Sequence, residues 1–211
     1  MSIPRESSDA SIREFLAALS SAEAAHGAVS AAALAGGLGT SLILMVTALP
    51  KTRSDSATDR TALIAASTAL SALQEQLLEA IETETAVKIY AARSMPQISA
   101  AQRSEREAAI QLALRAAADV PLEIMRLSAL GLQHARSVAE HCSRAAAAEM
   151  ELGVTLLRAG FSGAQINLET RLGSLTDVLY TTAIVDEIAR LSEEATSAAS
   201  AAEASVRVPP A

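Results

Sequence analysis

The segment from His26 to Leu49, HGAVSAAALAGGLGTSLILMVTAL, constrains the fold more than any other part of this chain. After His26 it carries no charged side chain until Lys51, and alanine and glycine dominate its first half. So many uncharged residues are buried either in a lipid bilayer or at the centre of a helical bundle. A membrane span needs about 20 strongly apolar residues, whereas only residues 42–46 meet that description here. We therefore expect the central helix of a soluble protein and no membrane span.

A stripe of small residues on this helix supports that expectation. Ala32, Gly36 and Thr40 recur at every fourth position, which places them on one helix face. Residues this small allow the backbone of a second helix to come close. Pro50 then ends the helix, because proline lacks the N–H that another turn would need. Other helices are expected to pack around this one.

The rest of the chain also reads as helical. Hydrophobic residues make up 50% of it but aromatic residues only 2%, a composition that suits close-packed helices better than a sheet. Apolar residues recur at spacings of three and four, and no stretch alternates as a strand would. The sequence predicts an all-α helical bundle around a central Ala/Gly-rich apolar helix. We expect one domain over residues 11–197, a disordered lead-in over 1–10 and a flexible tail over 198–211.

Caps, prolines and glycines set the predicted helix boundaries. Ser8 or Asp9 is expected to cap a first helix that begins near Ser11. Pro121 suits the first turn of a new helix, and the glycines at 160 and 163 interrupt the pattern of another. The further helices are therefore expected at about 57–93, 100–118, 121–142, 145–159, 164–172 and 174–197, and the last is expected to bury Leu179, Ile184, Ile188 and Leu191.

Charge and cysteine content exclude several classes of function. The net charge is −7 and no basic cluster is interleaved with aromatic residues, so we expect no nucleic-acid partner. Cys142 is the one cysteine, which leaves no intrachain disulfide and no Cys/His metal site, and we expect no metal. The first residues, MSIPRESSDASIREF, lack the apolar core of a signal peptide, which favours a cytoplasmic location.

Carboxylates within apolar helices are the candidates for chemistry. Glu82 shares a helix face with Leu78, Ala86 and Ile89, at the edge of a buried stripe. A carboxylate that loses water there has a raised pKa and can act as a general acid or base. The alternative is a solvated glutamate on an amphipathic helix, and Glu151 has the same two interpretations.

Four pieces of the chain, in order and spacing, resemble a known family. They are SIREFLAALSS, SAAALAGGLGTSLILMV, AAADVPLEIMRLSALGLQHARSVAE and GVTLLRAGFSGAQINL, and together they span about Ser11 to Leu191. The chain resembles the cyclodeaminase domain of formimidoyltransferase-cyclodeaminase and the bacterial methenyltetrahydrofolate cyclohydrolases. The resemblance implies an all-helical homodimer whose substrate is a tetrahydrofolate derivative, with no tightly bound cofactor.

The departures from the family pattern fall at its functional positions. The family's Pro-Gly-Gly-Gly-Ser turn before the central helix reads His26-Gly27-Ala28-Val29-Ser30 here. Its catalytic-type Asp corresponds to Glu82, and the Asp of a second acidic segment corresponds to Glu151. An Asn of its last motif is kept as Asn167. The carboxylates are thus retained one methylene longer, whereas Ala28 and Val29 obstruct the close approach that glycines allow.

By this resemblance, Glu82 is expected to be catalytic, and Gly27, Ser30, Lys51, Arg53, Glu151 and Asn167 to bind substrate. His26 is a titratable group that the family's turn lacks, and we expect it to assist catalysis in place of the lost interactions. Glu82 would act as general acid or base at the carbon that bridges N5 and N10 of the folate. Lys51 or Arg53 would bind the glutamate carboxylate of the folate. Two alternatives remain open, namely a diverged relative that acts on another small ligand and a helical partner protein without catalysis.

Overall fold

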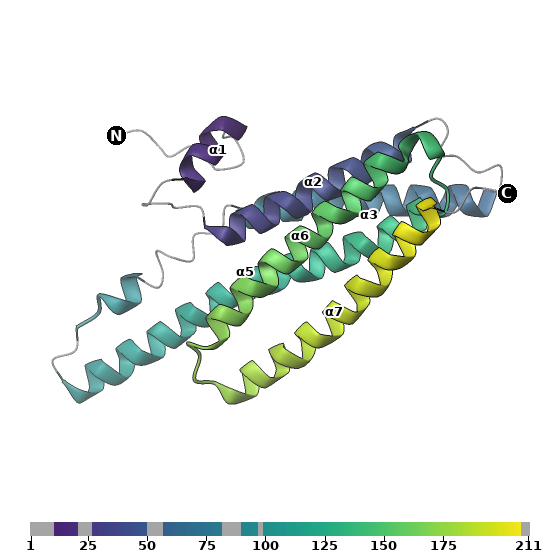
Figure 1. Ribbon diagram of the computed structural model, residues 1–211. Coiled ribbons are helices and arrows are strands. Elements are labelled where there is room, and N and C mark those ends of the chain that lie inside the picture. Colours follow the sequence, from purple (N-terminus) through teal and green to yellow (C-terminus); the bar gives the residue numbers. More distant parts are fainter. Residues whose placement is uncertain (1–10, 21–26, 50–56, 82–89, 97–98, 208–211) are drawn as a thin grey trace.

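The computed structural model describes residues 11–20, 27–49, 57–81, 90–96 and 99–207. Its regular elements, all helical within these ranges, are α1 (Ile12–Leu19), α2 (Ala28–Ala48), α3 (Ala57–Ile81), α5 (Ala100–Ala139), the short 3₁₀ helix η2 (Arg144–Ala146), α6 (Ala147–Leu172) and α7 (Val178–Arg207) (Figure 1). The predicted all-α bundle is confirmed.

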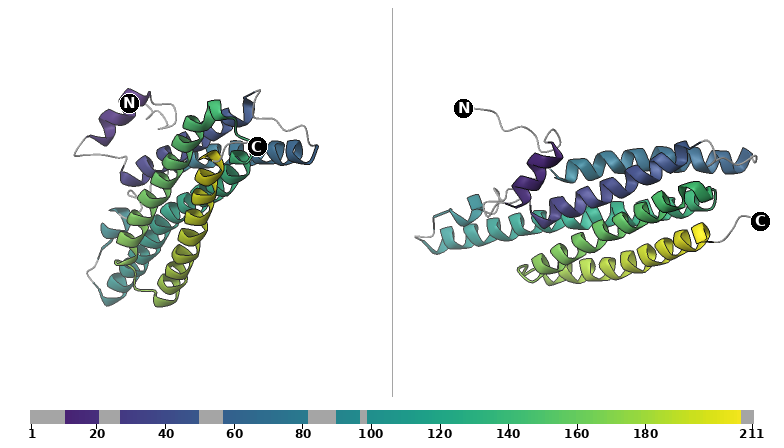
Figure 2. Two further views of the ribbon diagram at one scale, coloured as in Figure 1. Left: turned by 45° about the vertical axis from the view of Figure 1, so that its right-hand side comes forward. Right: turned by 45° about the horizontal axis from the view of Figure 1, so that its top comes forward.

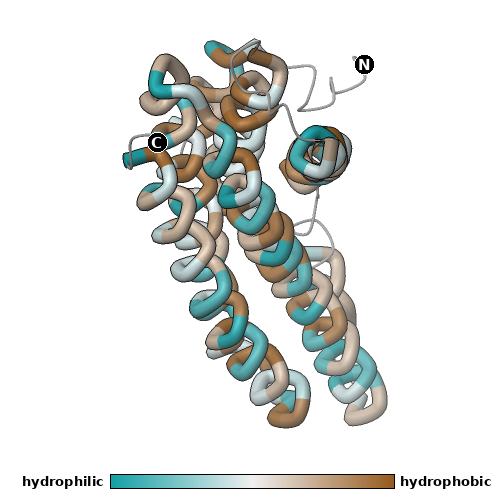
Figure 3. The backbone as a smooth tube through the Cα atoms, turned by 90° about the vertical axis from the view of Figure 1, so that its right-hand side faces the viewer, coloured by the Kyte–Doolittle hydropathy of each residue, from teal (hydrophilic) through white to brown (hydrophobic). Residues whose placement is uncertain are grey.

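The apolar helix α2 lies at the centre of the packing. It contacts α3, α5 and α6, and its most extensive contact is with α6. Helix α7 packs against α5 and α6 and lies away from α2 (Figure 2). Brown and teal positions alternate along the long helices in Figure 3, as expected for helices that turn one face to a core. The predicted central helix is therefore confirmed.

Glycines bring α2 and α6 into backbone contact. A Cβ on Gly39 would lie 2.6 Å from the carbonyl oxygen of Gly153 and 2.7 Å from the backbone nitrogen of Leu157. A Cβ on Gly160 would lie 2.8 Å from the nitrogen of Gly36. Later residues of α2 contact earlier residues of α6, so the two helices are antiparallel. Within the predicted stripe, the backbone at Ala32 and Gly36 lies against Gly160 of α6, whereas the Cβ position of Gly36 faces Leu77 of α3 and Ser128 of α5.

By length and composition alone, α2 could also cross a membrane, and half of its most apolar stretch is buried inside the protein. The core helix of a soluble protein has the same composition. Packing against three neighbouring helices accounts for the apolar character of the buried half.

Two predicted helix breaks are wrong. Residues 100–139 form one helix with Pro121 inside it, although proline removes a backbone hydrogen bond. Pro121 and the following Leu122 are buried, so packing outweighs the local cost. The glycines at 160 and 163 do not interrupt α6, because both residues face α2 across the close contact.

The helix ends also differ from the prediction. Ser11 itself caps α1, in a capping box with Glu14 whose backbone N–H donates to the Ser11 Oγ at 3.3 Å. Helix α7 continues past Ser197 to Arg207, and Ala202 is buried, so residues 198–207 are not the tail that their low complexity predicted. Leu179 is 85% exposed rather than buried. It lies in the first turn of α7, where its neighbour Tyr180 faces α5 instead.

The apolar residues that recur at helical spacing in α3 and α5 form buried faces: Leu63, Leu70, Leu73, Leu77, Ile81, Leu122, Met125, Ala129, Leu132 and Ala139.

Candidate functional site

Several predicted site residues lie outside the described part of the chain, namely His26, Lys51, Arg53 and Glu82. Gly27 is described and is the N-cap of α2, in an extended conformation that any residue can adopt. A Cβ on Gly27 would meet no atom within 4 Å. Val29 is half-buried against the core, so its side chain is directed into the protein rather than across the turn.

Ser30 joins the first turn of α2 to the last described turn of α3. Its side chain is buried, and its hydroxyl donates to the carbonyl oxygen of Ile81 at 3.2 Å. Glu82 is the next residue along the chain. The predicted ligand-binding turn is therefore joined to Ile81, the residue that precedes the predicted catalytic Glu82 in the sequence.

The two predicted residues of α6 lie far apart. Asn167 donates to the carbonyl oxygen of Gly163 at 2.8 Å, and Gly163 faces α2 at Ala32, near Ser30. Glu151 is sixteen residues earlier in the same helix, about 24 Å away at 1.5 Å per residue. Its carboxylate pairs with Arg207 at 3.6 Å. Within one chain, the structure brings Asn167 toward Ser30 but not Glu151.

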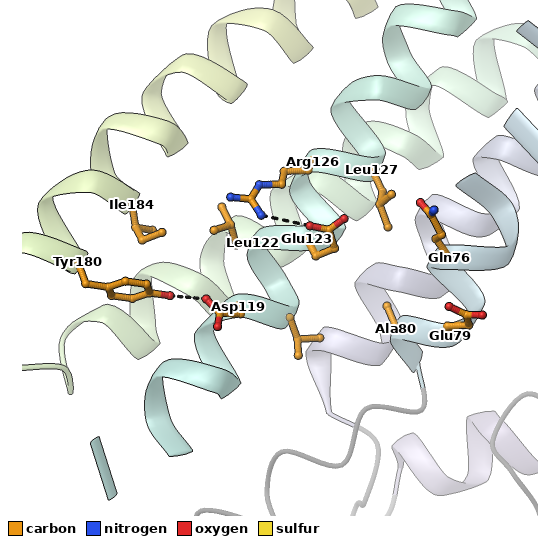
Figure 4. Close-up of a pocket in the computed structure, with 11 residues that line it drawn as sticks. Gln76, Glu79, Ala80, Asp119, Leu122, Glu123, Arg126, Leu127, Tyr180 and Ile184 are labelled. Atoms are coloured by element: carbon orange, nitrogen blue, oxygen red, sulfur yellow. Dashed lines mark hydrogen bonds and ion pairs between the residues drawn. The ribbon is translucent and has the colours of Figure 1, made fainter. Parts of the chain in front are cut away.

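A cavity of about 600 Å³ opens between α3, α5 and α7 (Figure 4). This is within the size range of small-molecule sites. Its α3 wall includes Glu79 and Ala80, one to two residues before the Ser30–Ile81 contact. The lining combines apolar side chains with a few polar ones: Gln76, Glu79, Ala80, Asp119, Val120, Leu122, Glu123, Arg126, Leu127, Tyr180 and Ile184.

A tyrosine–carboxylate pair lies at one end of this cavity. The Tyr180 hydroxyl donates to Asp119 Oδ1 at 2.6 Å, linking α7 to α5 (Figure 4). The guanidinium of Arg115 lies 4.1 Å from the centre of the Tyr180 ring, as in a cation–π contact. Burial, together with the hydrogen bond to Asp119, raises the pKa of Tyr180 to about 12. The phenol therefore stays protonated at neutral pH and keeps its proton directed at Asp119.

The guanidinium that the described residues bring to the cavity wall, that of Arg126, is already paired. Arg126 donates to both carboxylate oxygens of Glu187, at 2.8 and 2.9 Å, and to Glu123 at 3.2 Å. The hydrogen bond from Arg126 lowers the pKa of Glu187. Such a two-point contact fixes the planar guanidinium in place. Arg126 thus closes the wall between α5 and α7 rather than presenting a free positive charge.

These polar contacts repeat along α5 and α7. Asp119–Tyr180 and Arg126–Glu187 are followed one heptad later by Gln133, which donates to Glu194 at 3.4 Å. The two helices therefore run parallel and in constant register over this region. A seven-residue repeat of contacts is typical of helices that pack at a shallow angle.

The sequence interpretation missed Asp119, Tyr180 and Arg126. Asp119 opens the DVPL stretch that carried part of the family resemblance, so a signal was present for it. Tyr180 is one of two tyrosines in a chain poor in aromatic residues, but nothing in the sequence places it opposite Asp119. Their pairing depends on the register of α5 against α7, which is a property of the fold.

Among the described residues, no group of three or more His, Cys, Asp or Glu side chains is arranged to hold a metal ion. Two carboxylates of the cavity are joined instead to other side chains, Asp119 to Tyr180 and Glu123 to Arg126, an arrangement that suits proton transfer and hydrogen bonding to a ligand.

Comparisons with known proteins place this fold. The crystal structure of formiminotetrahydrofolate cyclodeaminase from Thermotoga maritima is similar, with a TM-score of 0.82 and 16% sequence identity, covering 94% of this chain and 96% of that one. At this identity the similarity establishes the fold. A search of curated proteins finds no match. The family described as formiminotransferase-cyclodeaminase matches residues 11–190, a range that includes all the described residues lining the cavity. The chain therefore belongs to the formiminotransferase-cyclodeaminase family.

Proposed function

We propose that this protein is a folate-dependent one-carbon enzyme that acts on tetrahydrofolate-bound C1 units by acid–base catalysis without a metal. The observation that carries the proposal is the family match over residues 11–190. The fold shared with a formiminotetrahydrofolate cyclodeaminase supports it, as does a ligand-sized cavity beside the junction of α2 and α3.

Either of two reactions fits this chemistry. In methenyl-tetrahydrofolate hydrolysis, a general base takes a proton from water as its oxygen adds to the bridging carbon. The bond from that carbon to N5 then breaks as N5 gains this proton, and the remaining hydroxyl proton leaves to solvent as the formyl C=O forms. In formimino-tetrahydrofolate cyclisation, N10 adds to the formimino carbon and gives up its proton, the amino group on that carbon gains a proton, and the carbon–nitrogen bond breaks to release ammonia. Each path needs one group that accepts and then returns a proton, and we assign this role to Glu82.

His26 is proposed to assist at the turn before α2, and Gly27, Ser30 and Asn167 to line the substrate site there. Lys51 or Arg53 is proposed to bind the glutamate tail. Glu151 is proposed to contribute through a second copy of the chain, because within one chain it lies at the far end of α6 from Asn167.

We further propose a cytoplasmic homodimer without nucleic-acid or membrane partners and without a tightly bound cofactor. The outer face of the uncharged helix α2 supports self-association, since Leu38 and Met45 are 48% and 43% exposed on it. Sedimentation equilibrium of the wild type and of Met45→Glu tests this. A dimeric wild type and a monomeric variant are expected, and a monomeric wild type contradicts the proposal.

The steady-state hydrolysis of methenyl-tetrahydrofolate, with ammonia release from formimino-tetrahydrofolate measured in parallel, tests the activity. Glu82→Gln should lower kcat by about 10²–10⁴-fold while helical circular dichroism stays unchanged. Glu75→Gln, an exposed position of α3 outside the cavity, is the matched control and should retain activity. No turnover by the wild type with either substrate contradicts the proposal, and an active Glu82→Gln removes Glu82 from the mechanism.

A second candidate is a diverged family member that acts on another small ligand. The replacement of two glycines by Ala28 and Val29 in the turn before α2 favours it. Calorimetry distinguishes the two candidates, since this alternative predicts no binding of methenyl- or formimino-tetrahydrofolate at high ligand concentration.

A further inference from the structure

The described residues that line the cavity between α3, α5 and α7 offer it hydrogen-bond acceptors rather than free donors. The lining includes the carboxylates Glu79, Asp119 and Glu123, and an ionised carboxylate can accept hydrogen bonds but cannot donate them. The proton of the Tyr180 hydroxyl is already donated to Asp119, so its oxygen retains only acceptor capacity toward the cavity. The amide of Gln76 can act in either sense.

The positive charge of Arg126 in the wall does not offset the acceptor character of the cavity. Arg126 is held by Glu187 and Glu123 through three hydrogen bonds. Glu79 and Asp119 line the cavity from α3 and α5, and neither carboxylate is ion-paired with Arg126. A ligand rich in N–H groups therefore fits these walls, whereas a carboxylate ligand would meet like charge.

The shape of the cavity adds a second constraint. Val120, Leu122 and Ile184 form apolar surface beside the polar groups. Flat heterocycles bury their faces against such surface and satisfy their edges with a few placed polar atoms. Asp119 has one oxygen engaged by Tyr180, which fixes the carboxylate plane, and its second oxygen is left to accept from a ligand.

We propose that this cavity binds a flat heterocycle with adjacent N–H donors, the aminopyrimidine edge of a pterin, and that Asp119 is the residue that accepts those hydrogens. Tyr180 is a positioning residue that holds the Asp119 carboxylate in the receiving orientation. The choice of a pterin rests on the proposed function, whereas the acceptor character of the site does not. The glutamate tail of a folate would extend out of the cavity, away from Glu79 and Asp119.

The test separates ring recognition from turnover. Calorimetry with 6-methyltetrahydropterin, which lacks the aminobenzoyl-glutamate tail, measures binding of the ring alone. Asp119→Asn keeps an oxygen that accepts from Tyr180 but loses the charge and one acceptor. It should weaken pterin binding by about tenfold to a hundredfold, the range for a lost hydrogen bond to a charged group. Asp186→Asn, an exposed aspartate of α7 outside the cavity, is the matched control and should bind as the wild type does.

Tyr180→Phe tests the positioning role. It removes the hydroxyl but keeps the ring beneath Arg115. It should raise the KM for the folate substrate severalfold with kcat unchanged, and Asp119→Asn should raise it further. Circular dichroism and thermal unfolding of each variant establish that the fold is retained. A residue needed only for folding would lower the amount of active protein and so would lower kcat at constant KM.

The outcomes distinguish the two proposals. Pterin binding that is sensitive to Asp119→Asn supports the cavity assignment even if no folate is turned over, in which case the proposed function fails alone. Folate turnover by the wild type with no pterin binding, or with binding that Asp119→Asn leaves unchanged, overturns the cavity assignment and leaves the proposed function intact. A fall in kcat at constant KM in Tyr180→Phe overturns the positioning role.

Discussion

The glycine contact between α2 and α6 makes a sharp prediction about stability. Gly39 and Gly37 lie two residues apart in the same helix, and both are buried. A Cβ on Gly39 would lie 2.6 Å from the Gly153 carbonyl oxygen, whereas a Cβ on Gly37 would meet no atom within 4 Å. Gly39→Ala and Gly37→Ala are therefore the same change in the same helix with opposite packing consequences.

The magnitude follows from two terms. Alanine is more favourable than glycine in a helix by about 1 kcal/mol, and this gain applies equally at both positions. Ordinary carbon contacts begin at 3.4 Å, so Gly39→Ala requires α6 to move away by about 0.8 Å, a gap that loses a large part of the dispersion attraction between the helices. The opposing atoms are backbone and cannot rotate aside. Overpacking of this kind costs about 2–3 kcal/mol.

Equilibrium urea unfolding, followed by far-ultraviolet circular dichroism, measures the difference. Gly37→Ala should be more stable than the wild type by about 0.5–1 kcal/mol, and Gly39→Ala less stable by about 1–2 kcal/mol. Because the propensity gain cancels between them, the two variants should differ by about 2–3 kcal/mol, or roughly 1 M in urea midpoint. Coincident midpoints, or a higher midpoint for Gly39→Ala, would refute a close backbone contact between α2 and α6.

Three further predictions concern polar contacts. In a Tyr90→Phe variant that circular dichroism shows to be folded, an ultraviolet titration reports Tyr180 alone, and its midpoint should be about 12. The free energy of unfolding should decline as pH rises from 10.0 to that value, because the unfolded chain loses the phenol proton first. A titration midpoint at 10.0 would contradict the contact with Asp119. Glu187→Gln should lose about 0.5–1 kcal/mol at neutral pH, because its partner Arg126 is partly exposed. The pKa of Glu187 is lowered in the folded state, so the stability difference between the wild type and Glu187→Gln should vanish as pH falls below 4.5 and through the folded-state pKa. A difference in urea midpoint that persists in acid would argue against this ion pair. Ser30→Ala leaves a buried carbonyl at the end of α3 without its donor and should cost about 1–2 kcal/mol in the same urea assay; an unchanged midpoint would show that this hydrogen bond adds nothing.

The architecture could be predicted where local pattern and global packing agree. An uncharged segment with small residues every fourth position became the central helix, and leucines at helical spacing in α3 became core. The prediction failed where tertiary contacts override a local rule. Pro121 and Gly160 are helix breakers in isolation, but each is buried inside a long helix whose neighbours outweigh the local cost.

The candidate site was harder to predict because it depends on register. The turn around Ser30 was identified from sequence, and its contact with Ile81 places it beside the residue before Glu82. The partnership of Asp119 with Tyr180 was not identified. A shift of α7 by one residue relative to α5 would separate them, and no local pattern encodes that alignment.

The contact of α2 with α6 has a consequence for synthesis of the chain. Roughly a hundred residues separate the end of α2 from the start of α6, so at about 5–20 residues per second the ribosome takes some 5–20 s to supply the partner. During that interval an uncharged helix long enough to span a bilayer leaves the exit tunnel without its main neighbour. Nascent chains of this protein should therefore depend on holding chaperones, and a truncation before residue 147 should aggregate or associate with membranes although the full chain packs α2 at its centre.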